Sequence, residues 1–285
     1  MRFALICSAA DPAGMNIRRA LLQLFPFEES GSFAAHPVYR AAIRPNEGGK
    51  GNRPGEATLI TLPGETIHAE HLDRELDAAG LKAEVMVFCT RHLAQSGIPT
   101  LTCHVPGNWG SAEMGGAPRQ LCCAPVAPLR AVYHELRREA TSLGWTMSLE
   151  ATHHGPALDT PALFAEIGSG AAQWGVPAAG DAVARAVMAA LESGRSVPKA
   201  FVVLGGGHYS HYAEKLMSDS AASHICPKHA LAALDEEMLR QSLTRTECEE
   251  KSVLLDWKGL GGEKRRILDL LASSGFSYER SDTFF

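Results

Sequence analysis

The chain has 285 residues, of which 45% are hydrophobic and 21% are charged, and its formal net charge is -5. This composition excludes disordered, collagenous and coiled-coil proteins. The acidic balance excludes a protein that coats nucleic acid through its total charge, although a local basic face stays open.

The amino-terminal segment lacks the features of a signal peptide or a membrane span. Its apolar run ends at Asp11 and Pro12, before either could form. The seven cysteines include no C-x-x-C pair, so neither a disulfide framework nor a thiolate zinc site is indicated. We therefore expect a cytoplasmic protein with reduced cysteines and no membrane partner.

Short apolar segments predict strands, and amphipathic segments between them predict helices. The predicted strands are Phe3–Ser8, Ala57–Leu62, Val85–Thr90, Leu121–Val126, Trp145–Thr152, Leu163–Gly168, Ala200–Leu204 and Val253–Trp257. The predicted helices are Pro12–Phe25, Glu70–Ala79, Pro128–Leu143, Asp181–Ser193, Asp235–Leu243 and Glu263–Ser273, and Gly144 is expected to end the third.

The alternation of strands and helices favours an α/β fold in three layers, α/β/α, with a mixed or mostly parallel sheet. We expect a single domain over residues 1–285. Residues 44–55 interleave Pro, Asn, Gly and Lys, so this segment is expected to be a mobile loop.

Histidines follow several of the apolar segments. His92, His104, the pair His153-His154 and His208 each come just after one. Ligands bind beyond the carboxyl ends of strands in α/β sheets, so these imidazoles are expected to share a pocket. The alternative is that each histidine caps its own loop through hydrogen bonds.

The segment Glu150–Pro156 holds a carboxylate and two imidazoles, which suit either a zinc ion or a general acid and base. Gly155, Pro156 and the β-branched Thr152 argue against a helical zinc motif. In an extended strand, Glu150 and His154 would lie roughly 13 Å apart. The chain must therefore bend here, or other histidines must complete the site.

Two glycine-containing segments are candidates for substrate binding. Gly205–Gly207 could bring backbone N–H groups to an anion, or could simply form a tight turn. Asn108 and Trp109 lie in a glycine-rich loop whose aromatic ring could stack on a base, or could be a buried anchor.

Basic residues near the carboxyl terminus are candidates for phosphate contacts. Lys258, Lys264, Arg265 and Arg266 follow the last predicted strand. They could contact a phosphate backbone by position, or could be charges on a solvated helix.

Taken in order, these motifs resemble one known family. The sequence is similar to the archaeal and plant type of D-aminoacyl-tRNA deacylase. The segments that carry this similarity are Thr102-Cys103-His104, Gly107-Asn108-Trp109-Gly110, Glu150 through Pro156, Gly205 through Tyr209, His224 through Lys228 and Asp256-Trp257-Lys258-Gly259. The resemblance implies a phosphorylase/hydrolase-like fold, a zinc requirement and hydrolysis of the ester that joins a D-amino acid to tRNA, which clears mischarged tRNA. It also implies that the protein is a monomer.

The resemblance and the clustering together give a set of expected site residues. The catalytic candidates are His92, His104, Glu150, His153, His154 and His208, and the metal candidates, for up to two Zn²⁺ per chain, are His104, Glu150, His153 and His154. The candidates for binding D-aminoacyl-tRNA are Asn108, Trp109, Gly205, Gly206, Gly207, Lys228, Lys258, Lys264 and Arg265.

Three alternatives stay open from the sequence. A metal-free deacylase could use a histidine base, because an aminoacyl ester is already activated. A zinc-dependent amidohydrolase or peptidase acting on small molecules could use the same histidines. A non-catalytic RNA- or nucleotide-binding module is the third, although ionisable groups concentrated at strand ends favour an enzyme.

Overall fold

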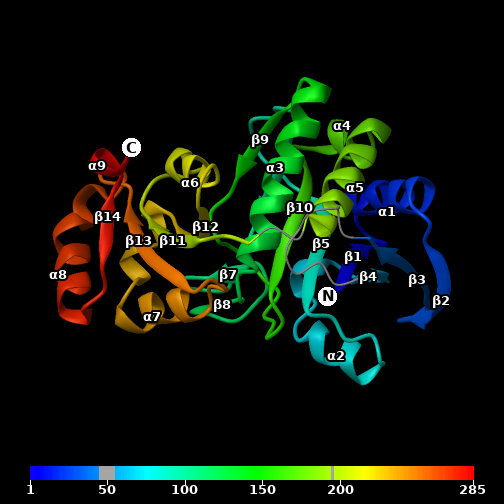
Figure 1. Ribbon diagram of the computed structural model, residues 1–285, viewed down its shortest axis with the longest axis horizontal. Helices are drawn as coiled ribbons and strands as arrows, with labels where there is room; N and C mark the ends of the chain where they lie inside the picture. The colour runs from blue at the N-terminus through cyan, green and yellow to red at the C-terminus, as the bar shows by residue number, and fades with distance from the viewer. Residues whose placement is uncertain (45–54, 194–195) are drawn as a thin grey trace.

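The computed structural model describes residues 1–44, 55–193 and 196–285. Residues 45–54 of the expected mobile loop lie outside the described residues. Most of the described strands form two sheets that lie beside each other along the molecule (Figure 1).

The first sheet has eight strands. They are β1 (Arg2–Ser8), β2 (Glu28–Phe33), β3 (His36–Ile43), β4 (Gly55–Leu62), β5 (Val85–Arg91), β6 (Thr100–His104), β9 (Thr146–Leu149) and β10 (Ala162–Gly168). Their order is β2-β3-β4-β1-β5-β10-β6-β9. The central strands β4, β1, β5 and β10 are parallel, and β6 pairs antiparallel with β10.

The second sheet has four parallel strands in the order β12-β11-β13-β14. They are β11 (Lys199–Leu204), β12 (Ala221–Cys226), β13 (Glu250–Leu255) and β14 (Tyr278–Arg280), and a separate pair is formed by β7 (Gly107–Asn108) and β8 (Gln120–Leu121).

Helices surround both sheets. They are α1 (Pro12–Leu24), α2 (Leu72–Ala78), α3 (Val126–Leu143), α4 (Ala171–Trp174), α5 (Pro177–Glu192), α6 (His211–Leu216), α7 (Glu236–Thr244), α8 (Lys264–Ser274) and α9 (Ser281–Phe284), with 3₁₀ turns at Thr66–His68, Lys228–Ala233 and Gly261–Glu263. None of the helices among these described residues is long and apolar enough to span a membrane.

Helix ends follow local chemistry. Asp11 caps α1 by accepting hydrogen bonds from the backbone N–H groups of Ala13 and Gly14, and Pro12 occupies the first helical turn. Gly144 ends α3 in the left-handed conformation (φ 70°), as predicted from the sequence.

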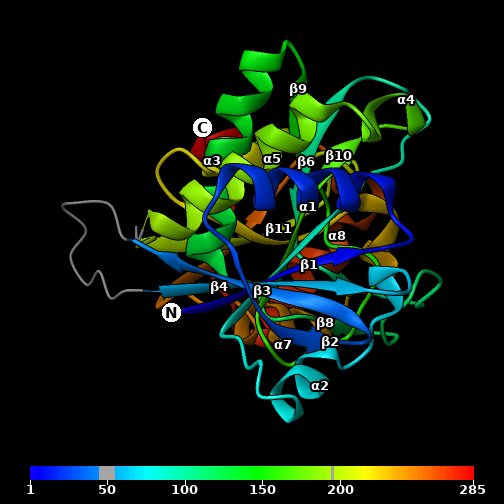
Figure 2. The ribbon, with the colours of Figure 1, turned by 90° about the vertical axis from the view of Figure 1, so that its right-hand side faces the viewer.

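The first sheet is covered on both faces. Leu5 and Val87 point to the face where α1, α3 and α5 pack, and they share one core with Ile17 and Val183. Phe88 and Phe164 point to the other face, toward α2. Figure 2 shows α1 and α2 on opposite sides of the sheet, which confirms the expected α/β fold.

One predicted strand is wrong. Leu121–Val126 contains only the end of β8, and α3 begins at Val126. The segment is apolar because it is buried between the two sheets, where the Ala124 N–H donates to the carbonyl of Arg245. Pro125 has no N–H with which to continue a ladder.

Other predicted boundaries differ by a few residues. The strand predicted over Trp145–Thr152 is β9, which stops at Leu149, and the one predicted over Val253–Trp257 stops at Leu255. The predictions missed β2, β3, β6, β7, β12 and β14, as well as the short helices α4, α6 and α9.

Candidate functional site

Five histidines and Glu150 lie together on one face of the first sheet. The ring centroid of His153 is 4.2 Å from that of His104, 4.3 Å from that of His154 and 4.7 Å from that of His208. Glu150 Oε2 lies 2.8 Å from His208 Nε2, and Glu150 Oε1 lies 3.1 Å from His92 Nδ1. The structure thus brings together all six residues that the sequence proposed as catalytic.

The reason for this convergence differs from the expected one. His92 follows the carboxyl end of β5, but β6, which carries His104, runs antiparallel to its neighbour β10. These side chains meet because alternate residues of a strand share one face of a sheet. Glu166 of β10 lies in the same row, where it accepts hydrogen bonds from the hydroxyls of Thr90 and Thr102.

The segment Glu150–His154 connects the two sheets. The Ala151 N–H donates to the carbonyl of His208 at 2.7 Å, and the Thr152 N–H donates to the carbonyl of Ile225 at 3.0 Å. The chain then turns at His154, whose φ of 45° is in the left-handed region. The chain also bends at Thr152, so His153 Nε2 lies 3.8 Å from Glu150 Oε2, and the segment is not extended, in agreement with the expected bend.

Gly155 makes the turn possible. A Cβ atom at this position would lie 2.2 Å from the backbone nitrogen of Gly116. Glu70 links the same two loops, because its carboxylate accepts hydrogen bonds from the backbone N–H groups of Gly116 (2.5 Å) and Ala157 (2.6 Å). The loop that carries His153 and His154 is therefore held by close backbone packing and by the half-buried carboxylate of Glu70.

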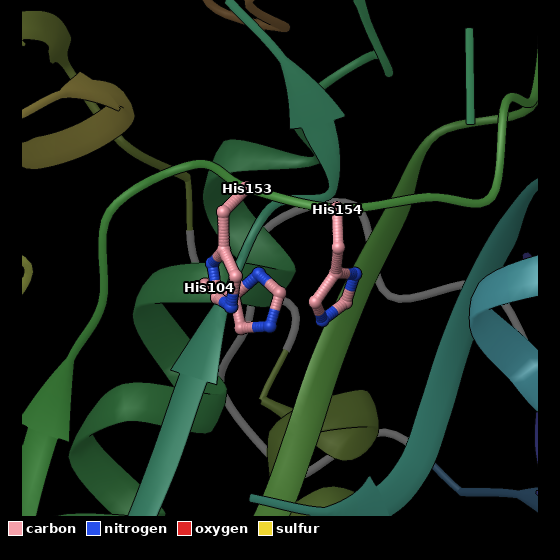
Figure 3. A group of neighbouring side chains, drawn as sticks. All are labelled: His104, His153 and His154. Carbon is pink, nitrogen blue, oxygen red and sulfur yellow. The ribbon is translucent and has the colours of Figure 1, made fainter. Parts of the chain in front are cut away.

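His104, His153 and His154 form a group with the chemistry of a metal site (Figure 3). One ring nitrogen from each lies within 4.8 Å of the others. Each Nδ1 lies within hydrogen-bonding distance of a backbone carbonyl, that of Val105 (3.3 Å), Ala151 (2.8 Å) or Gly155 (2.6 Å) respectively. Such bonds place the proton on Nδ1 and leave the Nε2 lone pairs for a metal ion.

The electrostatics of the three rings agree with that role. Burial lowers the pKa of His153 to about 4, that of His154 to about 3, and that of His104 well below its usual value. Their neutral forms therefore predominate at pH 7, as metal ligation requires. His104 Nε2 is buried and has no hydrogen-bond partner among the described residues.

Glu150 is the centre of a second group, which also contains His153 and His208. Burial acts to raise its pKa, but the hydrogen bond from His208 and the charge of His92 hold that pKa below its usual value. The pKa of Glu166 is well above its usual value because of burial and the nearby charge of Glu150. Burial and the surrounding charges thus move the pKa values of these two neighbouring carboxyl groups in opposite directions.

Two cavities adjoin the histidines, and His153, His154, His208 and Met114 line both of them. The first, here called the sheet-edge cavity, has a volume of about 350 Å³ and is bordered by Asp11, Glu65, Arg91, Leu93 and Glu166. The second, the loop cavity, has about 480 Å³ and is bordered by Asn108, Trp109, Pro227, His229 and Ala232.

Asn108 and Trp109 hold the loop that lines the loop cavity. The side-chain amide of Asn108 donates to the carbonyl of Gly115 at 2.9 Å, and the indole N–H of Trp109 donates to the carbonyl of Ile225 at 3.1 Å. Trp109 is 3% exposed, so its ring acts as a buried anchor of this loop.

The other predicted substrate-binding residues lie outside the histidine cluster. Gly205, Gly206 and Gly207 follow β11, Lys228 follows β12 and Lys258 follows β13, so all lie at the carboxyl edge of the second sheet. Lys264 lies 4.2 Å from the ring centroid of Trp257. Arg265 lies further along α8 and pairs with Asp269 at 3.0 Å.

Glu166, Glu70 and Tyr209 were missed as site residues by reasoning from the sequence. Tyr209 places its hydroxyl 3.0 Å from His92 Nε2. For Glu166 a signal existed, because it is the one charged residue in the apolar run Ala162–Gly168. For Glu70 none existed, since its two partners are backbone groups far along the chain.

Comparison with known proteins gives concordant matches. A family model described as D-aminoacyl-tRNA deacylase matches residues 79–279. A D-aminoacyl-tRNA deacylase of Pyrococcus furiosus is 37% identical over 268 residues, covering 92% of this chain and 93% of that protein. One of Thermococcus kodakarensis is 36% identical with the same coverage. A crystal structure of a conserved protein of unknown function superposes with a TM-score of 0.85 at 26% identity, covering 99% of this chain and 95% of that one.

Proposed function

The chain belongs to the D-aminoacyl-tRNA deacylase family, and we propose that it hydrolyses the ester of a D-aminoacyl-tRNA to free D-amino acid and tRNA with the help of bound zinc. The reaction would clear mischarged tRNA. Because its substrate is a charged tRNA, we expect the protein to act in the cytoplasm, and we propose that it does so as a monomer.

The observation that carries the proposal is the arrangement of His104, His153 and His154 beside the ionised Glu150. Three neutral imidazoles whose Nδ1 atoms face backbone carbonyls fit the ligand set of zinc, which takes nitrogen and oxygen donors. The unpartnered Nε2 of buried His104 supports this fit.

Zinc would be held by His104, His153 and His154. The adjoining group of Glu150, His153 and His208 would hold a second ion only in place of the hydrogen bond between Glu150 and His208. When bound, zinc supplies polarisation of the ester carbonyl and lowers the pKa of a coordinated water to ~7. The two groups share His153, so substitution of this residue is expected to affect both.

The protein's own groups supply the proton transfer and the orientation. The side chain of His208 is 36% exposed, it lines both cavities, and Glu150 fixes its ring through the 2.8 Å hydrogen bond. We assign His208 as the base that takes the proton of the attacking water, and Glu150 as the carboxylate that stabilises the resulting imidazolium. His92, held between Glu150 and the Tyr209 hydroxyl, stabilises this arrangement from the other side.

Backbone and basic groups at the carboxyl edge of the second sheet would hold the tRNA end. The Gly205 N–H already donates to the carbonyl of Cys226, and the nitrogen of Gly206 packs against Gly259. Gly207, which is exposed, is therefore the glycine whose N–H we assign to the developing oxyanion or the terminal phosphate. Lys228, Lys258, Lys264 and Arg265 would contact the acceptor end, so binding should weaken as salt rises.

The deciding experiment measures release of amino acid from a D-aminoacyl-tRNA and from its L counterpart, each with and without a strong chelator. Rapid loss of the D ester alone, abolished by chelator and restored by zinc, is expected. Selective loss that is indifferent to chelator would remove zinc from the mechanism. Hydrolysis of free aminoacyl amides without D-selective deacylation would favour a small-molecule amidohydrolase.

Matched variants locate the reaction. We expect His153→Ala and His154→Ala to lose both metal and activity, whereas His36→Ala, on the distant strand β3, should keep both. Full activity and metal content in both site variants would refute the assignment.

A further inference from the structure

The two cavities on either side of the histidines differ in lining, size and surroundings. Asp11, Glu65 and Glu166 line the sheet-edge cavity together with Arg91, and Arg91 forms an ion pair with Glu65. Glu113 is the one acidic residue that lines the loop cavity. An acidic lining attracts an ammonium group and repels phosphate.

The loop cavity borders the carboxyl edge of the second sheet, where Lys228 and Lys258 lie. Pro227 and His229, which flank Lys228 in the chain, line this cavity, and Lys228 packs beside Gly261 at the β13 side of the edge. Lys258 and Lys264 continue the row toward β14. A nucleic-acid strand that follows these lysines therefore arrives at the loop cavity first.

The sheet-edge cavity lies on the far side of the histidines from this row. It is formed where β1, β4 and β5 end, since Asp11, Glu65 and Arg91 follow or close these strands. Its 350 Å³ is within the range of small-ligand sites, and Ile67, Leu93 and Met114 give it apolar surface.

We propose that the loop cavity binds the 3′-terminal adenosine of the tRNA, and that the sheet-edge cavity binds the D-aminoacyl group with its ammonium toward the acidic lining. The ester bond then lies between the two cavities, beside the four residues that line both, Met114, His153, His154 and His208. The sheet-edge cavity alone then determines which amino-acid side chains are accepted, and the loop cavity determines the affinity for the nucleotide. This assignment rests on the proposed deacylase function.

Two exposed residues allow a crossed test with little risk to folding. Leu93 is 73% exposed at the sheet-edge cavity, and Ala232 is exposed at the loop cavity. Leu93→Trp should lower kcat/KM for D-tyrosyl-tRNA about tenfold more than for D-alanyl-tRNA, because it reduces the space for a large side chain. Ala232→Trp should lower both values equally.

Binding of adenosine 5′-monophosphate, measured by calorimetry on the metal-loaded proteins, gives a second readout that does not depend on catalysis. Ala232→Trp should weaken this binding about tenfold, and Leu93→Trp should leave it within about twofold of the wild type. The reverse pattern, or equal effects of both variants on either readout, would overturn the assignment. Failure of the wild type to deacylate any D-aminoacyl-tRNA would instead refute the proposed function, and the nucleotide measurements would still decide which cavity takes the adenosine.

Discussion

His224 allows a quantitative test of how buried imidazoles affect stability. It is 0% exposed in β12, its Nε2 lies 3.2 Å from the carbonyl of Arg245, and its Nδ1 has no hydrogen-bond partner among the described residues. Burial lowers its pKa from the usual 6.5 to about 4. Because the folded pKa is below the unfolded one, the unfolded chain binds a proton first, so stability falls as pH drops from 6.5 toward 4.

The expected size of this effect follows from the two pKa values. At 1.36 kcal/mol per pKa unit, the complete effect is about 3 kcal/mol, and about 2 kcal/mol of it develops between pH 7 and pH 5. The variant His224→Asn keeps a polar side chain beside Arg245 but does not titrate. We therefore expect the free energy of unfolding of the wild type to fall by about 2 kcal/mol more than that of the variant over this range.

Urea unfolding at pH 7, 6 and 5, followed by both circular dichroism and tryptophan fluorescence, measures the difference. His36→Asn, the same substitution on strand β3 of the first sheet, is the control. Parallel pH profiles for the wild type and His224→Asn would refute the reasoning.

Three further predictions concern activity. Glu150→Gln keeps the shape of the side chain but removes the charge between His92 and His208, so it should lower kcat at least about 100-fold and reduce bound metal. Single-turnover deacylation and atomic emission measure the two effects, and unchanged rate and metal content would exclude Glu150 from the site. Glu70→Gln should lower kcat about tenfold with little change in KM, because it weakens the hydrogen bonds that hold the loop of His153 and His154. Equal kinetics for Glu70→Gln and the exposed control Glu75→Gln would contradict this role. Lys258→Ala should raise KM and should reduce the slope of log binding constant against log salt concentration by the amount expected for about one phosphate contact. Lys82→Ala, beside α2, is the control, and identical slopes for the two variants would show that Lys258 does not contact the tRNA.

The elements best predicted from the sequence are those whose burial is locally uniform. β1, β5 and β10 are largely apolar and covered on both faces, and α1 has an Asp cap, a following Pro and an apolar stripe. In these segments the local pattern and the tertiary environment agree, so the pattern alone was sufficient.

The missed strands lack such agreement. Glu28–Phe33 is an edge strand with almost entirely exposed side chains, so no alternation marks it. Ala221–Cys226 carries Ser223 and His224 at buried positions, and those polar residues hid a strand that tertiary contacts stabilise. The wrongly predicted strand after Leu121 shows the converse, because burial between sheets makes a segment apolar without making it a strand.

The candidate site was predictable in its residue types but not in its geometry. His153 and His154 are adjacent in sequence, yet only the left-handed turn at His154 and the close approach of Gly155 to Gly116 give them their positions. Those contacts involve residues separated by tens of positions, and no spacing rule encodes them. Glu166 is marked in the sequence as the one charged residue of its apolar run, but its partners Thr90 and Thr102, on two neighbouring strands, could not be predicted.

The strand order β5-β10-β6-β9 also determines when the site can form during protein synthesis. β6 follows β5 in the chain but pairs with β10 and β9, so Phe164, the residue opposite His104, is made only after β9. His208 is made later still, and only then can the Ala151 N–H donate to the His208 carbonyl. The candidate site therefore cannot be complete on a nascent chain before His208 has been made.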